Sequence, residues 1–590
     1  AVAFHPDYLA NPLVFCGTIG LIPRGMSEKS VQDGDLIVAM GGRTGRDGIH
    51  GATFSSIELT SESEVVSSGA VQIGNAITEK MVLDVLMQAR DRGLYRAITD
   101  CGAGGFSSAV GEMGAEIGAE VDLESAPLKY DGLSYTEIWI SEAQERMVLA
   151  VPPEKWADLD ALAKSEGVEA TVLGRFVNSG KLVLRYHGNV VGQIDMHFLH
   201  EGRPRVTRKA ESTPLVTVDP EFGSDPNHQT ELLELLGNEN IASKEWIIRQ
   251  YDHEVQAATI VKPLVGVNAD APSDAAVLWP SMATNKGVAI SNGLQIHAGM
   301  IDSYRMAALA IDEAVRNCVA VGADPKRIAL LDNFCWGNPE RPENLDRLVE
   351  AAEACHDLSL AWQTPFISGK DSLYNEFLHD GQSRSIPPTL LISALGMIPD
   401  VHQAVTMDFK AAGNEVWILG LSQSAMGGST WASQYLNSPA KIPSVDPELS
   451  IQIFHRLHEA IQKGLIRSCH DISEGGLAVA LAEMCLGGKL GLQASLRDIP
   501  CEDSAAIDTI LLFSESPSRF VVEVSPENAA ELTALWGELP LGKVGEVVGP
   551  DSSGLERLTI KGLDQTVLID VTLQEIEEAW KQPLDWFPKC

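Results

Sequence analysis

A glycine-rich segment near the start of the chain has the composition of an anion-binding loop. GGRTGRDGIHGA, residues 41–52, places a glycine at every third position and sets two arginines, an aspartate and a histidine between them. Glycine adopts positive φ and has no Cβ, so neighbouring backbone N–H groups can converge on one phosphate. A flexible surface loop has a similar composition, and the segment matches neither the P-loop nor the G-x-G-x-x-G pattern. The candidate phosphate-binding residues are Gly42, Arg43, Gly45, Arg46, Gly48 and His50.

An aspartate that precedes a second glycine cluster could bind a metal ion. Asp100 lies just before Gly102, Gly104 and Gly105, and an apparent helix follows. Mg²⁺ is usually bound by one or two carboxylates together with phosphate oxygens, which suits this position. A role as N-cap of the following helix explains the aspartate equally well. The residue types leave both interpretations open.

Two further polar segments could contact a nucleotide. LDNFCWGNPE, residues 331–340, is predicted to be a strand that runs into a turn, where Asp332 could bind a ribose or base or could cap the turn. FISGKDSLYN, residues 366–375, offers glycine, lysine, aspartate and serine in succession, which suits phosphate contact but also a short polar turn. Cys335 has no obvious histidine partner, so we expect an inert thiol.

These segments belong to a chain that repeats itself. DCGAGGFSSAVGEM from Asp100 resembles DISEGGLAVALAEM from Asp471, and SEAQERMVLAV from Ser141 resembles SESPSRFVVEV from Ser514. Several such matches in the same order and at nearly constant spacing predict two tandem units. The counterpart of the glycine loop, GLSQSAMGGST at 420–430, has fewer glycines and no charged residue. Because a structural turn has no need to lose its charges in one copy, this favours a functional role for the first loop.

Each unit is predicted to contain two domains, which we call N-type and C-type in the order in which they follow one another along the chain. Most of the first N-type domain is predicted to be absent. Hydrophobic patterning predicts strands at 35–40 and 416–421 and helices at 80–92 and 306–321, so the fold class is α/β (α+β). The predicted boundaries are 1–27 for the last strand region of the first N-type domain, 28–201 for the first C-type domain, 202–249 for a linker, 250–400 for the second N-type domain and 401–590 for the second C-type domain.

Composition excludes several classes of partner. The chain has 590 residues and a net charge of −37, so its surface repels nucleic acid and anionic membranes. No apolar run approaches the ~20 residues that a membrane-spanning helix needs. The nine cysteines are scattered and form no CxxC pair, which predicts a reducing cytoplasm and argues against a zinc site or a disulfide scaffold.

In this order, GGRTGRDGIHGA, DCGAGG, ISEAQERM, QYDHEVQAATIV, DNFCWGNPE and SGKDSLYN resemble phosphoribosylformylglycinamidine synthase, of the aminoimidazole ribonucleotide synthetase-like superfamily. The resemblance implies tandem N-type and C-type domains, with the N-type domains forming a central barrel and the second C-type domain degenerate. It implies an enzyme that uses ATP and Mg²⁺ to convert formylglycinamide ribonucleotide to formylglycinamidine ribonucleotide through an iminophosphate. A glutaminase would supply the ammonia.

The resemblance also assigns residues by position. Substrate contacts would come from Gln72, Glu142, Ala143, Gln144 and Ser372. ATP contacts would come from Asp332, Gly369 and Lys370, and the magnesium ligand would be Asp100. The catalytic histidine is expected upstream of Ala1, in a missing N-terminal segment, so this chain alone is expected to be incomplete. The alternatives are another ATP-dependent synthetase of the superfamily and a non-catalytic nucleotide-binding scaffold for a glutaminase.

Overall fold

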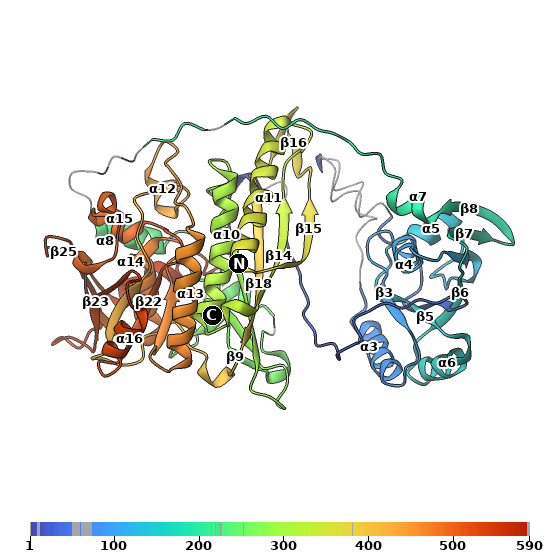
Figure 1. Ribbon diagram of the computed structural model, residues 1–590, viewed down its shortest axis with the longest axis horizontal. Helices are drawn as coiled ribbons and strands as arrows, with labels where there is room; N and C mark the ends of the chain where they lie inside the picture. The colour runs from blue at the N-terminus through green and yellow to red at the C-terminus, as the bar shows by residue number, and fades with distance from the viewer. Residues whose placement is uncertain are drawn as a thin grey trace. The chain divides into compact units, whose positions relative to one another are not determined.

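The chain forms two compact units in the computed structural model (Figure 1). Unit 1 contains Ala1–Leu13, Lys209–Tyr374 and Ser385–Cys590, and unit 2 contains Val14–Arg208 and Asn375–Arg384. The residues that the structure describes are 2–8, 12–49, 59–60, 74–213, 215–218, 220, 222, 227–251, 253–379 and 381–586.

Unit 2 is built on a seven-stranded sheet. The strand order is β3 (Ala97–Asp100), β5 (Arg146–Val151), β1 (Leu36–Gly41), β6 (Ala170–Phe176), β4 (Ala119–Asp122), β7 (Lys181–Tyr186) and β8 (Asn189–Asp195). All neighbours are antiparallel except β4 and β7, which are parallel. A separate three-stranded sheet has the order β17 (Gln382–Ser385), β16 (Glu376–His379) and β2 (Leu59–Thr60).

Helices cover both faces of this sheet because successive side chains of a strand point to opposite sides. Along β1, Ile37 and Ala39 enter one hydrophobic core, and Val38 and Met40 enter another. The first core is closed by α4 (Phe106–Met113) and α5 (Tyr135–Ile140), and the second by α3 (Ala76–Asp91) and α6 (Trp156–Ser165). Figure 1 shows the two helix pairs on either side of the strands. A short helix, α7 (Met196–Glu201), follows β8.

Unit 1 contains the N-type domain, a six-stranded sheet with two long helices. The strand order is β15 (Phe366–Ser372), β14 (Ile328–Cys335), β18 (Thr389–Ile398), β13 (Gly287–Leu294), β12 (Ala276–Leu278) and β9 (Thr259–Val261). Helix α10 (Ser303–Ala320) packs against β13, β18 and α11 (Pro342–Trp362) and is buried along almost its whole length. Between β9 and β12 in the sequence, β10 (Leu264–Val265) and β11 (Ala271–Pro272) pair with each other as a two-stranded ribbon.

The second C-type domain, also in unit 1, repeats the sheet of unit 2 strand for strand. Its order is β20 (Ser468–Asp471), β22 (Phe520–Val524), β19 (Glu415–Leu419), β23 (Leu541–Val548), β21 (Gly491–Ser495), β24 (Arg557–Lys561) and β25 (Val567–Thr572). The one parallel pair, β21 with β24, occupies the same place as β4 with β7. Its helices are α12 (Thr430–Tyr435), α13 (Pro447–Gln462), α14 (Gly476–Gly488), α15 (Asp508–Phe513), α16 (Ala529–Trp536) and α17 (Leu573–Lys581).

This correspondence confirms the duplication predicted from the sequence. The register shift between Ile37 and Val38 in β1 recurs between Val416 and Trp417 in β19, so even the irregularity of the central strand is repeated. The four predicted strands and helices at 35–40, 416–421, 80–92 and 306–321 are present as β1, β19, α3 and α10. In the described part of the chain the N-type sheet is open, with β15 and β9 at its edges. The central barrel stays a prediction.

Three local expectations differ from the structure. The range 202–249, expected to be a linker, contains α8 (His228–Leu236) and α9 (Glu245–Ile248), and the leucines of α8 enter the core of the second C-type domain against α17. The described residues of 1–27 form no strand, because none of them pairs with a neighbouring strand. Residues 366–372 form the edge strand β15 and not a turn. No helix in the described part of the chain has both the length and the apolar character needed to cross a bilayer.

The contact between α10 and β13 gives a test of the N-type core. A Cβ added at Gly293 would lie 1.9 Å from the carbonyl oxygen of Ala310 and 2.8 Å from the nitrogen of Ala314. Because both neighbours are helix backbone, neither can move aside. We expect Gly293→Ala to lower the free energy of unfolding by about 1–3 kcal/mol or more. Gly549→Ala, at a position with open space around it, is the matched control. Equal melting temperatures for the two variants would contradict this packing.

Candidate functional site

Three of the predicted segments emerge at one edge of the unit 2 sheet. Strands β1 and β3 end there, at Gly41 and Asp100, and the antiparallel strand between them, β5, begins there at Arg146. Gly41 is paired with Arg146, and Asp100 with Met147. The antiparallel order of β1, β5 and β3 therefore brings the loops 41–48, 100–105 and 141–145 together, although they are far apart in the sequence.

The glycine loop is packed closely against the 141–145 segment. The Gly42 N–H donates to the carbonyl oxygen of Glu145 at 2.9 Å, and a Cβ at Gly42 would lie 2.7 Å from the carbonyl oxygen of Gln144. The Ser141 hydroxyl donates to the carbonyl oxygen of Gly45 at 2.7 Å. This close backbone approach by itself requires glycine at position 42, whether or not the loop binds a ligand. His50, and Gln72 of the predicted substrate contacts, lie outside the described residues.

The two loop arginines are exposed and paired with carboxylates. Arg43 Nε lies 2.8 Å from Glu169 Oε2, and Arg46 Nε lies 2.7 Å from Glu137 Oε1. The bond from Arg46, aided by the backbone N–H of Ser134, lowers the pKa of Glu137 to about 2. Arg46 also donates to the carbonyl oxygen of Gly132 at 2.7 Å. Exposed ion pairs of this kind contribute little to stability; phosphate binding by the two arginines stays a prediction.

Asp100 is not the cap of the following helix. Helix α4 begins at Phe106, and its N-cap is Gly105, with φ of 57°. In the second copy α14 likewise begins after Gly475 and not after Asp471. The helix-cap interpretation is therefore wrong for both aspartates, because the glycine turn separates each of them from its helix. The Asp100 side chain is exposed at the end of β3, beside the loop of glycines.

Glu142 connects the three loops. Its Oε1 accepts a hydrogen bond from the Gly104 N–H at 3.1 Å, and its own N–H donates to the carbonyl oxygen of Asp47 at 2.9 Å. Ala143 is fully buried, and the Gln144 side chain donates to the carbonyl oxygen of Glu142 at 3.2 Å. Of the predicted substrate residues in this segment, Glu142 therefore has a structural role; substrate contact by the segment stays a prediction.

Arg146, which sequence reasoning missed, lies beneath the loops. Its guanidinium donates to the carbonyl oxygens of Ala143 at 2.8 Å and Ser141 at 2.5 Å and to Thr44 Oγ1 at 2.8 Å. It also stacks over Phe106, 4.4 Å from the ring centroid. The signal in the sequence was the arginine shared by SEAQERM and SESPSRF, where it aligns with Arg519.

The second copy has the same architecture, but a buried arginine of the protein balances the charge of its aspartate. Asp471, the counterpart of Asp100, is buried, and Arg316 Nε lies 3.0 Å from its Oδ2. Arg316 Nη1 also lies 2.5 Å from Asp312. Potential metal-ligand atoms lie within 4.8 Å of one another on Asp471 and two neighbours, Asp274 and His470. Burial alone lowers the pKa of His470, but contacts with Asp274 and Glu483 outweigh it and raise the pKa well above the usual range.

The predicted ATP residues lie together in unit 1. The parallel strands β14 and β15 pair Asp332 with Gly369, and a Cβ at Gly369 would lie 2.3 Å from Asp332 Oδ1. The glycine therefore makes room for the carboxylate, whose pKa is raised by burial and by Asp371. Lys370 and Ser372 follow on β15, opposite Asn333 and Cys335. Burial raises the pKa of Cys335 to about 12, as expected for an inert thiol.

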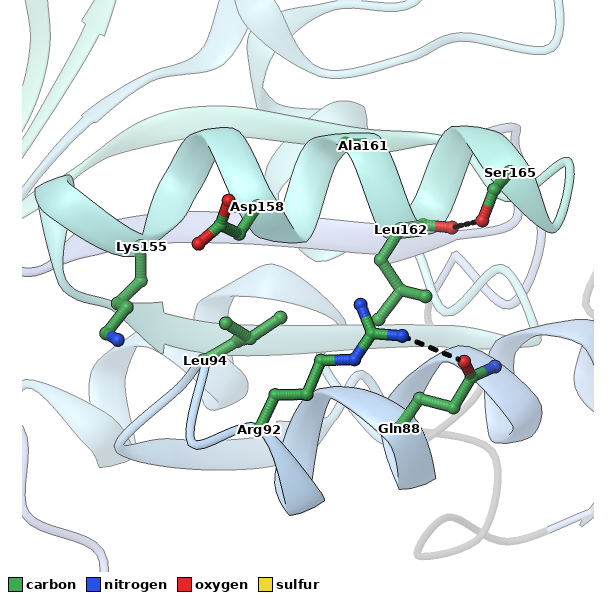
Figure 2. A pocket seen from close by; sticks show the side chains of 8 residues that line it. All are labelled: Gln88, Arg92, Leu94, Lys155, Asp158, Ala161, Leu162 and Ser165. Carbon is green, nitrogen blue, oxygen red and sulfur yellow. Dashed lines mark hydrogen bonds between the residues drawn. The ribbon is translucent and has the colours of Figure 1, made fainter.

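A groove elsewhere on unit 2 contains none of the predicted residues. It has a volume of about 540 Å³ and lies between α3 and α6 (Figure 2). Its lining residues are Gln88, Arg92, Leu94, Lys155, Asp158, Ala161, Leu162 and Ser165. Leu94 lies just before the start of β3 and Lys155 just after the end of β5, at the opposite edge of the sheet from Asp100 and Arg146. The groove is therefore separate from the candidate site.

Comparison with known proteins agrees with these domains. The AIR synthase related protein C-terminal domain matches residues 32–187 and 411–557, and the corresponding N-terminal domain matches 272–398. The phosphoribosylformylglycinamidine synthase subunit PurL of Thermoplasma volcanium is 34% identical over 99% of this chain and 75% of its own length. The subunit of the same name from Deinococcus radiodurans is 36% identical over 99% of this chain and 77% of its own length.

Solved structures share the fold. PurL of Thermotoga maritima complexed with FGAR matches with a TM-score of 0.63 and 23% identity, over 89% of this chain and 74% of that one. The same protein complexed with ATP matches with a TM-score of 0.59 and 21% identity, over 88% and 71%. The matches span about three quarters of each relative's own length. The N-terminal segment expected upstream of Ala1 stays a prediction.

The buried charges around Arg316 lead to a stability prediction. Replacing Arg316 with methionine leaves Asp312 and Asp471 buried without their cation, so we expect a loss of about 3–5 kcal/mol. Adding Asp471→Asn to Arg316→Met removes one uncompensated charge and should recover part of that loss. Arg456→Met, which breaks the exposed pair with Glu459, is the control and should cost less than about 1 kcal/mol. Denaturant unfolding measures all three; equal losses for Arg316→Met and Arg456→Met would exclude this account.

Proposed function

Because the chain belongs to the phosphoribosylformylglycinamidine synthase subunit PurL family, we propose that it converts formylglycinamide ribonucleotide to formylglycinamidine ribonucleotide with ATP. The observation that carries the proposal is the meeting of the glycine loop, the Asp100 loop and the 141–145 segment at one sheet edge in the copy that retains the charged loop. The T. maritima proteins with FGAR and with ATP add support.

The reaction needs an activated amide. The amide oxygen of the substrate attacks the γ-phosphorus of ATP, and ADP leaves. Ammonia then adds to the imidate carbon, the C–O bond breaks, and phosphate departs with the oxygen, which leaves the amidine. Such chemistry depends on positioning and on charge stabilisation by N–H donors and cations more than on a protein nucleophile. The ammonia would come from glutamine, released by a glutaminase partner.

Each segment has a role in this proposal. The glycine loop, with Arg43, Arg46 and His50, would surround a phosphate of the ribonucleotide or of ATP. The predicted substrate contacts are Gln72, Glu142, Ala143, Gln144 and Ser372. On the N-type sheet Asp332 and Gly369 would hold ATP, and Lys370 would neutralise a phosphate directly. Arg43 and Arg46 would exchange their surface carboxylates for the anion.

Asp100 fits a magnesium ion. It is an exposed carboxylate beside a glycine turn, and a Cβ at Gly102 would lie 2.8 Å from its Oδ2, so the turn leaves space at the carboxylate. Magnesium at this position would neutralise negative charge on the phosphates. The contrast with Asp471, whose charge Arg316 already balances, supports assigning the ion to the first copy.

The activity is tested with the chain, the segment predicted upstream of Ala1, a glutaminase partner, ATP, Mg²⁺, glutamine and formylglycinamide ribonucleotide. We expect ADP release that depends on the ribonucleotide, and a product lighter by about 1 Da because an oxygen is replaced by NH. Ammonium in place of glutamine separates amidine formation from ammonia supply. ADP release with formylglycinamidine ribonucleotide alone would identify another synthetase of the superfamily. Nucleotide binding without turnover of either substrate would identify a scaffold.

The metal role of Asp100 is tested by substitution. Asp100→Asn keeps the shape and removes the charge, so we expect magnesium-dependent activity to fall by about 100-fold or more if the carboxylate binds the ion. The melting temperature should change little, because Asp100 does not cap α4. Asp158→Asn, on α6 in the groove of Figure 2, is an exposed aspartate at the opposite sheet edge and serves as control. Parallel losses of melting temperature and activity in Asp100→Asn would favour a structural role.

A further inference from the structure

We infer that Arg146 is a positioning residue that fixes the glycine loop and the 141–145 segment in their ligand-binding arrangement. The holding role is inferred from the contacts of Arg146. Its effect on substrate binding rests on the proposed function. The residue does not belong to the predicted substrate, nucleotide or metal contacts. Its three hydrogen bonds end on two separate segments, at Thr44 in the glycine loop and at Ser141 and Ala143 in the other.

The guanidinium is buried, and its three hydrogen-bond acceptors are neutral oxygens. Its residue is 4% exposed, and no carboxylate among the described residues forms an ion pair with it. Burial lowers the pKa of Arg146, and the Asp47 carboxylate, which forms no ion pair with it, only partly opposes the shift. A buried cation without a counter-ion must satisfy its N–H donors on carbonyl and hydroxyl oxygens, because unpaired donors are costly there. Movement of either segment would break these bonds, so both are held in place.

The geometry of the bonds requires arginine. Nε donates to Ala143, Nη1 to Thr44 and Nη2 to Ser141, so each nitrogen of the planar group serves a different acceptor. Lysine carries the same charge on a single nitrogen and cannot reproduce this divergent set of donors. The ring of Phe106, at the start of α4, covers the face of the guanidinium and joins the Asp100 loop to the same centre.

The segments held by Arg146 in turn hold the rest of the site. Ser141 binds the carbonyl oxygen of Gly45 through its hydroxyl, and Glu142 accepts from Gly104 in the loop after Asp100. A shift of residues 141–143 would therefore displace the proposed phosphate loop and remove the acceptor of the Gly104 N–H. Arg146 would set where these groups meet the substrate without touching it.

The second copy supplies a matched control. Arg519 is buried in the same way, with Nη1 2.8 Å from Ser422 Oγ, Nε 3.2 Å from the carbonyl oxygen of Ser516 and Nη2 bonded to the carbonyl oxygen of Ser514. The loop that it holds, at 420–430, lacks charged residues. Loss of Arg519 should therefore disturb the fold as loss of Arg146 does, but should leave substrate recognition unchanged.

The experiment compares Arg146→Met, Arg146→Lys and Arg519→Met in the full chain with its glutaminase partner. For Arg146→Met we expect the KM for formylglycinamide ribonucleotide to rise about tenfold or more, which corresponds to about 1.4 kcal/mol. The kcat of the saturated enzyme should stay within about threefold, as expected when ground-state and transition-state binding are lost together. Arg146→Lys should recover melting temperature more than KM. Arg519→Met should lower the melting temperature similarly and leave KM within about twofold.

A proportional loss of activity and folded protein in Arg146→Met, with KM unchanged, would overturn the inference. An equal rise of KM in Arg519→Met would overturn it as well. If Arg146→Met does not fold, Arg146→Lys alone must show the raised KM.

A second readout separates this inference from the proposed function. Amide hydrogen exchange of peptides covering 42–48 and 141–145 should accelerate about tenfold or more in the Arg146 variants, while the core strand 147–151 stays protected. Absence of ribonucleotide-dependent turnover in the unmodified chain supplied with the predicted upstream segment would end the proposed function, yet faster exchange in these loops would still support the holding role. Unchanged exchange in both loops would overturn that role, whatever the activity.

Discussion

A buried guanidinium among backbone carbonyl oxygens is the interaction on which the loops of each C-type domain depend. Arg146 in the first copy and Arg519 in the second donate to loop oxygens where water is excluded. A buried charge without a carboxylate partner is tolerated only when its donors are satisfied. Movement of the loops would therefore leave guanidinium N–H groups buried without acceptors, which is energetically unfavourable. The sheet brings the loops to one edge, and the arginine makes their arrangement specific.

The two copies show how one architecture supports different chemistry. The strand order, the parallel pair and the bulge of the central strand are the same in both. The aspartate at the end of the first strand of each sheet is also the same, but Asp100 is exposed and Asp471 is paired with Arg316 from helix α10. A protein cation thus balances in one copy the charge that a metal ion would balance in the other. Function follows from such local groups and not from the fold.

The proposed ATP site in the N-type domain depends on the register in which two strands pair. Asp332 and Gly369 come from strands separated by the whole of α11, and parallel pairing places them side by side. The missing Cβ at Gly369 provides the space that the carboxylate occupies. In a chain with a net charge of −37, each phosphate contact that we propose would rely on a glycine N–H, a basic side chain or a metal ion.

The sequence by itself determined the duplication, the α/β class, the main strands and helices, and the segments that carry the family's chemistry. These are properties of local hydrophobic period and of residue order, which adjacent residues specify. It did not determine which polar groups are buried. That Asp100 does not cap α4 depends on where the glycine turn ends, and that Arg146 lies beneath the loops depends on β5 pairing with both β1 and β3. The leucines of α8 are buried because α14, β25 and α17, all far along the chain, pack against the helix. Such burial and hydrogen bonding arise from contacts between distant segments, so only the tertiary structure decided them.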